Sequence, residues 1–322
     1  AQVGNDTDPY KTSKYYGISD FPASASVPTT LHNANFKPEI TTSYEAGLEY
    51  NLFKSRFTMD LTFYSNTTKN QILDVPLDPT TGYSRAVLNA GVVRNKGIEL
   101  LVGGKPIKTK DFSWTTTLTW SKNDNEVLEL AEGLSDKQDI GYGGNATIQA
   151  RVGGTTGDIY GFGFVRAPDG QIVYRTTGLP ERPGQIQYIG KAYADWRGGL
   201  SNEFQYKNYR LSFLIDGQYG GMIYSQTHHK MAEQGKLTKT LAGREEGFIV
   251  GEGVVAAAGG TYVPNTKQVA PAAFYGDYYR RANVESNTFD ASFIKLREVR
   301  LEYGIPAKLS KKLKLNNASL AL

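Results

Sequence analysis

Cysteine is absent from the 322 residues, which excludes disulfide bonds and any metal site built on thiolates. Long apolar runs are absent too. The longest, Val254–Ala258, is far short of the roughly 18 residues that a transmembrane helix needs. Strong charge of one sign is also lacking: the net charge is +4, and this weak balance points to no nucleic-acid partner.

Histidine is scarce, and this argues against several kinds of catalytic chemistry. The three histidines, His32, His228 and His229, all lie in expected loops, and no nucleophile, base and orienting group fall together. Adjacent side chains point in different directions on either a helix or a strand, so His228 and His229 make a poor metal pair. The sequence therefore predicts neither an enzyme nor a metal or cofactor site.

The sequence is rich in tyrosine, with 21 residues, and in glycine, with 35. Its main pattern is alternation. Apolar residues recur at every second position from Tyr44 to Leu52 and again from Phe57 to Phe63, on either side of Lys54-Ser55. This predicts two strands joined by a tight turn, each with one apolar and one polar face.

The same alternation predicts about eight strands in all. Further strands are expected around 98–102, 112–120, 196–204, 209–215, 289–306 and 318–322. The apolar parity changes between Leu296 and Val299, and one extra residue near Arg297-Glu298 would restore a single apolar face. A β-bulge is therefore expected there.

The connections indicate a membrane barrel. Short links at Lys54-Ser55, 104–111, Lys207-Asn208 and 304–314 alternate with long ones at 66–96, 121–191 and 220–288. Short periplasmic turns and long extracellular loops are typical of outer-membrane barrels, and several expected strands reach the length needed to cross a bilayer. The fold class predicted is all-β, a transmembrane antiparallel β-barrel.

The positions of charged and aromatic residues are consistent with short links on the periplasmic side and long loops on the extracellular side. The short links hold many cations against Asp111 alone, and aromatic residues such as Tyr44, Trp120 and Tyr303 lie near strand ends on the apolar parity. We expect the apolar parity to face lipid (Leu48, Phe57, Met59, Leu61 and Phe63) and the polar parity to face a wet lumen (Glu45, Glu49, Asp60 and Thr62). Solubility alone is another explanation of the cations.

Three other interpretations stay open at this stage. A self-contained eight-stranded barrel is possible in principle, although the first 40 or so residues show no strand to pair and the last strand stops in mid-pattern. A soluble β-sandwich that binds carbohydrate is a second alternative. A passive pore is a third.

Several segments resemble one family of barrels. The segment 36–53 resembles a late barrel strand of TonB-dependent outer-membrane transporters, and the segments 63–100, 111–127 and 290–306 resemble the SusC/RagA subfamily in particular. The resemblance implies part of a 22-stranded plugged barrel in the outer membrane of a Gram-negative, Bacteroidetes-type bacterium. It implies import of oligosaccharides or peptides, energised by the TonB complex through a plug domain, with a SusD-like surface lipoprotein as partner.

The resemblance also implies how the chain is divided. Residues 1–41 are expected to form an extracellular loop segment, and residues 42–322 the C-terminal part of the barrel with its three long loops. The plug domain and the final strand of the family have no counterpart here, so we expect an internal piece of a longer transporter.

Ligand contacts are expected in the long loops, where aromatic rings can stack on sugars or grip a peptide. Packing of these rings within the loops themselves is the alternative. Asp169-Gly170 also predicts a small type I′ hairpin. The candidate substrate-binding residues are Tyr142, Tyr160, Phe162, Tyr174, Tyr224 and Tyr275.

Overall fold

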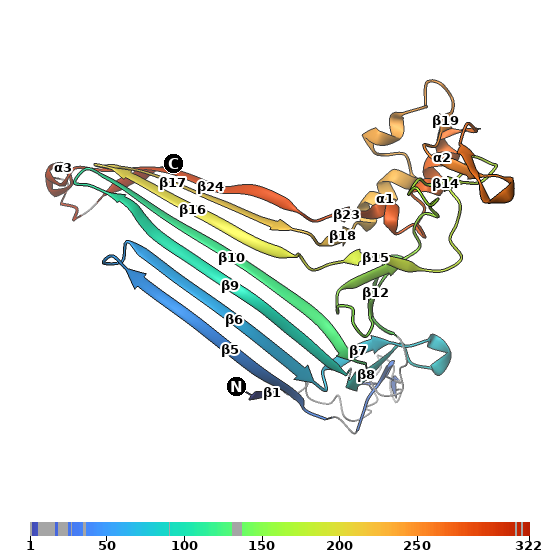
Figure 1. The fold of residues 1–322 in the computed structure, drawn as a ribbon, viewed down its shortest axis with the longest axis horizontal. Helices are drawn as coiled ribbons and strands as arrows, with labels where there is room; N and C mark the ends of the chain where they lie inside the picture. The colour runs from blue at the N-terminus through green and yellow to red at the C-terminus, as the bar shows by residue number, and fades with distance from the viewer. Residues whose placement is uncertain are drawn as a thin grey trace.

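A computed structural model describes residues 2–5, 17–18, 25–26, 28–34, 37–89, 91–130, 137–312, 314–316 and 318–322. One large antiparallel sheet dominates it, with short turns at one end and long, folded loops at the other (Figure 1). Within the described ranges, no helix is long and apolar enough to cross a bilayer.

The sheet has nine strands in the order β1-β5-β6-β9-β10-β16-β17-β24-β25. The eight predicted strands are confirmed, and most are longer than the sequence indicated. Their bounds are β5 Glu39–Leu52, β6 Phe57–Lys69, β9 Val92–Lys108, β10 Phe112–Glu129, β16 Trp196–Tyr206, β17 Tyr209–Tyr219, β24 Phe293–Gly304 and β25 Ser319–Ala321.

The ninth strand, β1 (Gln2–Asn5), was not predicted. It pairs antiparallel with β5, from Gln2 opposite Thr42 to Asn5 opposite Glu39. The sequence indicated no paired strand in this region, and that expectation is wrong for these four residues. A strand of four residues carries too few alternations to stand out from a loop.

The predicted short turns lie together at one end of the sheet. Phe53, Lys54 and Ser55 adopt left-handed φ angles of 56°, 58° and 62°, which reverse the chain between β5 and β6. Lys207, with φ 52°, does the same between β16 and β17. The link from β24 to β25 contains the helix α3 (Ala307–Lys312), which alternation could not reveal.

The predicted β-bulge in β24 is confirmed. Leu214 lies opposite Glu298 while the next residue, Ile215, lies opposite Leu296, so Arg297 is the additional residue. The shift keeps Leu296 and Val299 on one face of the sheet, because two residues of β24 here oppose one position of β17.

The register places the predicted apolar residues on one face of the sheet. Leu48 lies opposite Leu61, and Leu61 lies opposite Leu100; this row continues through Trp120 to Gly198. Glu49 and Asp60 face each other on the opposite surface. Apolar side chains remain exposed on the first face, including Leu48 and Leu118, which are 44% and 42% exposed. We refer to this as the outer face and to the polar side as the inner face.

The outer face has the height of a bilayer. On β10 its apolar part runs from Phe112 to Trp120, and Lys122 is the first charged residue beyond it. Nine residues at about 3.4 Å each, tilted by about 40°, span roughly 23 Å along the membrane normal, close to the apolar band of about 25 Å in such barrels. Above this band the outer face carries ion pairs, such as Arg94 with Glu126.

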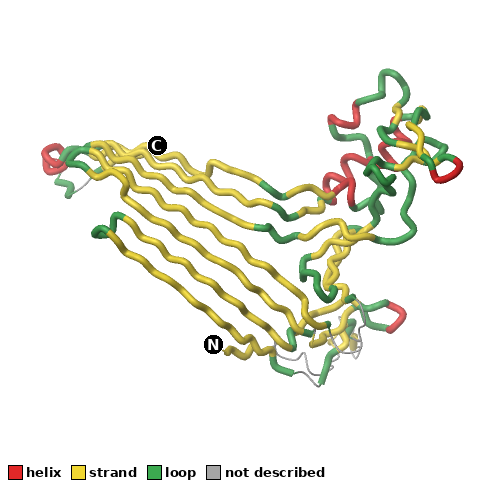
Figure 2. The backbone as a smooth tube through the Cα atoms, viewed as in Figure 1, coloured by secondary structure: helices red, strands yellow, loops and turns green. Residues whose placement is uncertain are grey.

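Small sheets and helices make up the loops (Figure 2). The loop before β9 contains β7 (Ile72–Pro76), η1 (Pro79–Thr81) and β8 (Arg85–Asn89), with β4 (Thr30–Leu31) beside β8; β2 (Gly17–Ile18) pairs with β3 (Ala25–Ser26). The loop before β16 contains β11 (Gln138–Gly143), β12 (Ala146–Ala150), β13 (Asp158–Gly161), β14 (Val173–Tyr174) and β15 (Gln187–Lys191).

The loop before β24 holds two of the three α-helices in the described ranges. They are α1 (Gln226–Glu233) and α2 (Pro271–Tyr278). Its other elements are β18 (Met222–Tyr224), η2 (Thr238–Leu241), β19 (Ile249–Val250), β20 (Val254–Ala256), η3 (Ala258–Gly260), β21 (Tyr262–Pro264), β22 (Gln268–Val269), η4 (Glu285–Asn287) and β23 (Thr288–Asp290). β14 pairs with β20, which joins this loop to the previous one.

The buried hydrophobic clusters belong mainly to the loops. One joins Ala146 and Ile159 to Val284, and another joins Tyr174 to Phe274 and Tyr275. The sheet itself is open, since β1 and β25 are its two edges in the described part of the chain. This arrangement matches part of a large barrel and departs from both a closed eight-stranded barrel and a β-sandwich.

Candidate functional site

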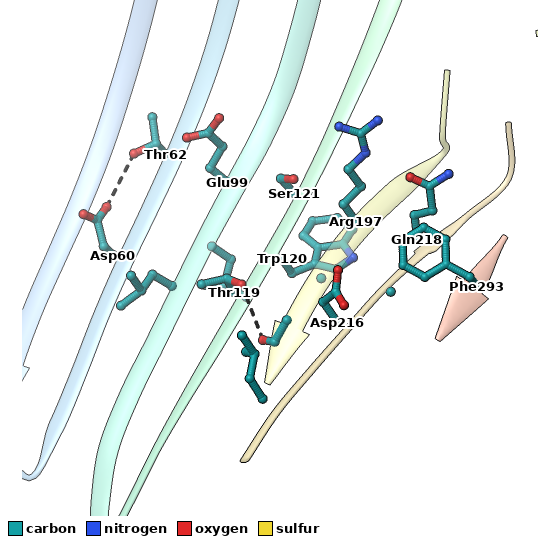
Figure 3. Close-up of a pocket in the computed structure, with 16 residues that line it drawn as sticks. Asp60, Thr62, Glu99, Thr119, Trp120, Ser121, Arg197, Asp216, Gln218 and Phe293 are labelled. Atoms are coloured by element: carbon teal, nitrogen blue, oxygen red, sulfur yellow. Dashed lines mark hydrogen bonds between the residues drawn. The ribbon is translucent and has the colours of Figure 1, made fainter. Parts of the chain in front are cut away.

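A hollow of about 610 Å³ lies across the middle of the sheet (Figure 3). It spans β6 to β24, and its polar residues project from the inner face. Gly199 leaves one inner-face position of β16 without a side chain, which lowers the floor of the hollow. Its labelled lining residues in Figure 3 are Asp60, Thr62, Glu99, Thr119, Trp120, Ser121, Arg197, Asp216, Gln218 and Phe293.

One row of inner-face residues crosses five strands at the same height. Thr62 lies opposite Glu99, Glu99 opposite Ser121, Ser121 opposite Arg197, and Arg197 opposite Gln218. These side chains offer both hydrogen-bond donors and acceptors. The row suits contact with water, a polar ligand or another polar protein surface.

An ion pair anchors one side of the hollow. Arg297, the bulge residue, donates from both Nε and an Nη atom to the two carboxylate oxygens of Asp216, the Nη distance being 3.0 Å. Glu99 and Asp60 lie on the opposite side. The hollow thus has an acidic side on β6 and β9 and a mixed-charge side on β16 to β24.

A ladder of amides connects this wall to the loops. Tyr64 donates to Asn123 Oδ1 at 3.0 Å, and Asn123 and Asn125 both donate to Asn95 Oδ1. Asn125 in turn accepts from the backbone N–H of Thr156 at 2.8 Å. The upper inner face and the loop before β16 therefore form one continuous polar surface.

Gly97 shows how closely this surface is packed. A Cβ atom at Gly97 would lie 2.5 Å from the Tyr64 hydroxyl and 2.4 Å from the Lys122 carbonyl oxygen. Only glycine lets the Tyr64 ring cross β9 here.

Three of the predicted aromatic residues are at least partly accessible. Tyr142 on β11 is 62% exposed, and its hydroxyl donates to Asp139 at 2.9 Å. Burial of the phenol and the neighbouring carboxylate raise the pKa of Tyr142.

Tyr160 is half-buried between Tyr188, with ring centroids 5.6 Å apart, and the guanidinium of Arg151. Phe162 is half-buried, and its backbone forms an isolated parallel β-bridge with Asn283.

The other three pack within the loops. Tyr174 is 2% exposed and stacks on Phe274, and burial raises its pKa. Tyr275 is also buried, and its hydroxyl donates to the Lys239 carbonyl at 3.0 Å. Tyr224 is half-buried against Gly144, and burial raises its pKa. Tyr174 and Tyr275 share one buried cluster, and Tyr142 and Tyr160 both lie opposite Thr147, so the structure brings the six residues together only in pairs.

The predicted hairpin at Asp169-Gly170 is present, but its turn type is wrong. The backbones of Arg166 and Ile172 form an antiparallel β-bridge, and the Gly170 N–H donates to the Ala167 carbonyl at 2.9 Å. Only Gly170 has a positive φ, of 88°. Pro168 fixes a negative φ and favours the first central position of an ordinary turn, so Pro168 and Asp169 become the central residues.

Several inner-face residues were missed by sequence reasoning. Arg197 and Gln218 lie on the polar parity of β16 and β17, so the alternation contained the signal. Tyr193, which hydrogen-bonds Thr156 at 2.8 Å, carried no such signal because it lies in a loop.

The histidines do not form a metal site. His228 Nδ1 lies 2.9 Å from Asn287 Oδ1, and the buried His229 has its Nε2 3.0 Å from Glu233. Within the described ranges no three histidine or acidic side chains gather as metal ligands would.

Comparison with known proteins gives one family. The family model described as TonB dependent receptor-like, beta-barrel matches residues 9–226. A TonB-dependent receptor of Formosa agariphila, P39, is 27% identical over 91% of this chain. The TonB-dependent receptor SusC of Bacteroides thetaiotaomicron is 30% identical over 65% of this chain. The chain spans 32% and 22% of these two proteins.

Solved structures agree on the fold. The RagAB peptide transporter covers all of this chain with a TM-score of 0.72 and 18% sequence identity. The RagAB peptide importer in its open-open state gives a TM-score of 0.70. In each case the chain spans about a third of the solved chain, 36% and 34%.

Proposed function

The chain belongs to the TonB-dependent receptor β-barrel family, and from this premise we propose that it forms the wall and outer loops of an energised importer. A chain of this type lies in the outer membrane of a Bacteroidetes-type bacterium. The family consists of transporters and receptors rather than enzymes. Import by the whole protein is the function that the geometry supports best.

The observation that carries the proposal is the two-sided sheet. Its outer face keeps a band of exposed apolar side chains, while its inner face presents the row from Thr62 to Gln218. A barrel wall between lipid and a wet lumen needs this division. A soluble sheet would instead cover its apolar face with a second layer.

The proposed cargo is an oligosaccharide or a peptide. The inner-face amides Asn95, Asn123 and Asn125 and the carboxylates Asp60 and Glu99 offer hydrogen bonds to either class. The exposed ring of Tyr142 and the half-buried Tyr160 are candidate loop contacts. One of the relatives compared is named SusC, and the structure with the same fold is called the RagAB peptide transporter.

The proposed partners follow from the same family. A SusD-like surface lipoprotein would cover the loop end of the sheet, and the TonB complex would act through a plug domain outside these residues. The described chain supplies the capture surface and the wall.

Uptake by living cells tests the proposal. Cells expressing the whole protein that contains this chain are given labelled oligosaccharides and peptides, with and without a protonophore. An importer loses uptake of its cargo when the proton-motive force is collapsed. Uptake that continues unchanged would support the passive-pore alternative and contradict the proposal.

The wall residues are tested in the same assay. Replacing Arg197 with Gln removes the one cation among the five residues of the inner-face row, and we expect uptake to change without loss of the barrel. Arg300→Gln is a control, since Arg300 lies lower on the same face beside Glu302.

A further inference from the structure

A group of cations at the short-turn end of the sheet is not explained by import. We call it the basic rim. Its members are Lys54, Arg56, Lys105, Lys108, Lys110, Lys207, Lys308, Lys311, Lys312 and Lys314. All are exposed, and none of them forms an ion pair in the described part of the chain. Arg210 is excluded because it lies near Glu203 and Glu302.

The rim is one-sided in charge. Asp111 is the only acid in the four segments that carry the rim, which comprise the short links and the end of β9 (53–56, 105–111, 207–208 and 305–315). The chain as a whole has a net charge of +4, so without the rim it would be net negative. A need for solubility would be met by cations anywhere on the exposed surface, and therefore does not account for their position.

The four links come together in space. The three hairpin turns and α3 lie at the same end of the sheet, opposite the long loops (Figure 1). An antiparallel sheet with strands in chain order brings every second connection to the same end, but it does not require that end to carry the cations.

Aromatic and apolar side chains lie directly beside these cations. Tyr209 and Tyr303 pack with ring centroids 4.9 Å apart at the lower edge of the outer face. Lys207 Nζ lies 5.3 Å from the ring of Tyr206. Phe53, at the tip of the first turn, is 76% exposed, and Leu309 on α3 is 49% exposed. Aromatic rings with cations at their polar end are typical of the headgroup level of a bilayer.

We propose that the basic rim binds anionic phospholipid headgroups of the inner leaflet of the outer membrane. The lysines meet the phosphates, and the apolar side chains at the rim enter the acyl boundary. Each lysine near a negatively charged membrane surface strengthens binding about fivefold. The lipid-binding proposal depends on the membrane location of the barrel and not on the import function. A result that contradicts one of the two proposals therefore leaves the other standing.

The whole protein that contains this chain is purified and placed in bilayer nanodiscs of phosphatidylethanolamine with increasing phosphatidylglycerol. Native mass spectrometry then measures which lipid stays bound. The test variant carries K308Q, K311Q, K312Q and K314Q. The control carries K137Q, K230Q, K236Q and K267Q, which remove the same charge from exposed lysines of the outer loops.

We expect the wild type and the control to retain phosphatidylglycerol at least roughly tenfold over phosphatidylethanolamine in low salt, and the rim variant to lose most of this preference. Heat-dependent migration in gels confirms that each variant still forms a barrel. Any further variant at Lys54 and Arg56 should lose preference in the same direction.

Three results would overturn the proposal. The first is a rim variant with an unchanged preference, and the second is an equal loss in the loop control. The third is displacement of the lipid by inorganic phosphate or by an acidic peptidoglycan fragment at similar concentration, which would make the rim a general anion site or a cell-wall contact.

Discussion

Among single residues, His228 shows how the outer loops are held together. It lies on α1, its Nδ1 is 2.9 Å from Asn287 Oδ1, and its ring packs edge-on against Phe289 with centroids 4.7 Å apart. Tyr279 also contacts the ring, and Lys239 lies over Tyr279. A charged imidazole would meet burial and a nearby cation here, so the neutral form is favoured.

This setting predicts a pH dependence of the loop. Burial, Lys239 and His229 lower the pKa of His228 below its ordinary value of 6.5, while the bond to Asn287 opposes the shift. Neutral His228 therefore stabilises the folded loop fully above pH 6.5, the ordinary pKa of histidine. This stability is lost as the pH falls below 6.5, because the folded loop accepts the proton less readily than the unfolded chain. Hydrogen exchange in 222–241 and 284–290, corrected for intrinsic rates, should therefore speed up from pH 7.5 to 5.5.

The variant His228→Gln should remove that pH dependence, because an amide keeps a hydrogen bond and does not titrate. His32→Gln is the matched control and should leave it in place. An unchanged pH response in His228→Gln would show that another group is responsible.

At the scale of elements, each strand of the sheet must keep its apolar side chains on the outer face, and β24 does so only through its bulge. Leu296 before the bulge and Val299 after it both lie on the outer face because Arg297 is left out of the pairing. The same residue contacts Asp216 on the inner face. Arg297 therefore acts both through its backbone, which sets the register, and through its side chain, which lines the hollow.

Deleting Arg297 should leave the barrel able to form, because Leu296, Val299 and Leu301 then alternate without interruption on the outer face. The deletion removes the bulge and the contact with Asp216 together. Heat-dependent migration of the whole protein in gels should show that the barrel persists.

The substitution Arg297→Ala separates these two roles. It keeps the number of residues and removes only the contact with Asp216, so the barrel should still form. A barrel that is lost when Arg297 is deleted, or that fails in Arg297→Ala, would contradict the assignment of Arg297 as the additional residue of the bulge.

For the whole molecule, the central feature is a sheet whose two faces meet different solvents. Leu118 and Thr119 are neighbours on β10, yet one lies on the outer face and the other borders the hollow. The same substitution at these two positions therefore reports on the surroundings of each face.

Leu118→Arg should destabilise the barrel by about 2–4 kcal/mol, since an arginine would face the bilayer interior. Thr119→Arg should change stability much less, because the inner face is wet. Urea unfolding from lipid vesicles measures both. Equal effects at the two positions would argue that Leu118 does not face lipid.

Much of the wall was predictable from the sequence, because period-2 alternation directly reports which side chains share a face. The bulge at Arg297 and the turn at Lys54-Ser55 were found in this way. The helix α3 and the strand β1 were missed, since one breaks the alternation and the other is too short to show it.

The loops were less predictable for a physical reason. Aromatic residues such as Tyr142 and Tyr174 look alike in sequence, but one is 62% exposed and the other 2%. The difference arises from contacts between distant segments, as when β14 pairs with β20. The inner-face residues Arg197 and Gln218, in contrast, could have been chosen from strand parity alone.

The alternation of short and long connections has a consequence for how such a protein can diverge. Every long loop leaves and re-enters the sheet at the same end, between strands that pair with each other in any case. Doubling the length of a flexible loop costs only about 0.6 kcal/mol in closure entropy. Insertions, deletions and exchanges of loop segments can therefore accumulate at one end of the sheet while the scaffold of paired strands stays unchanged.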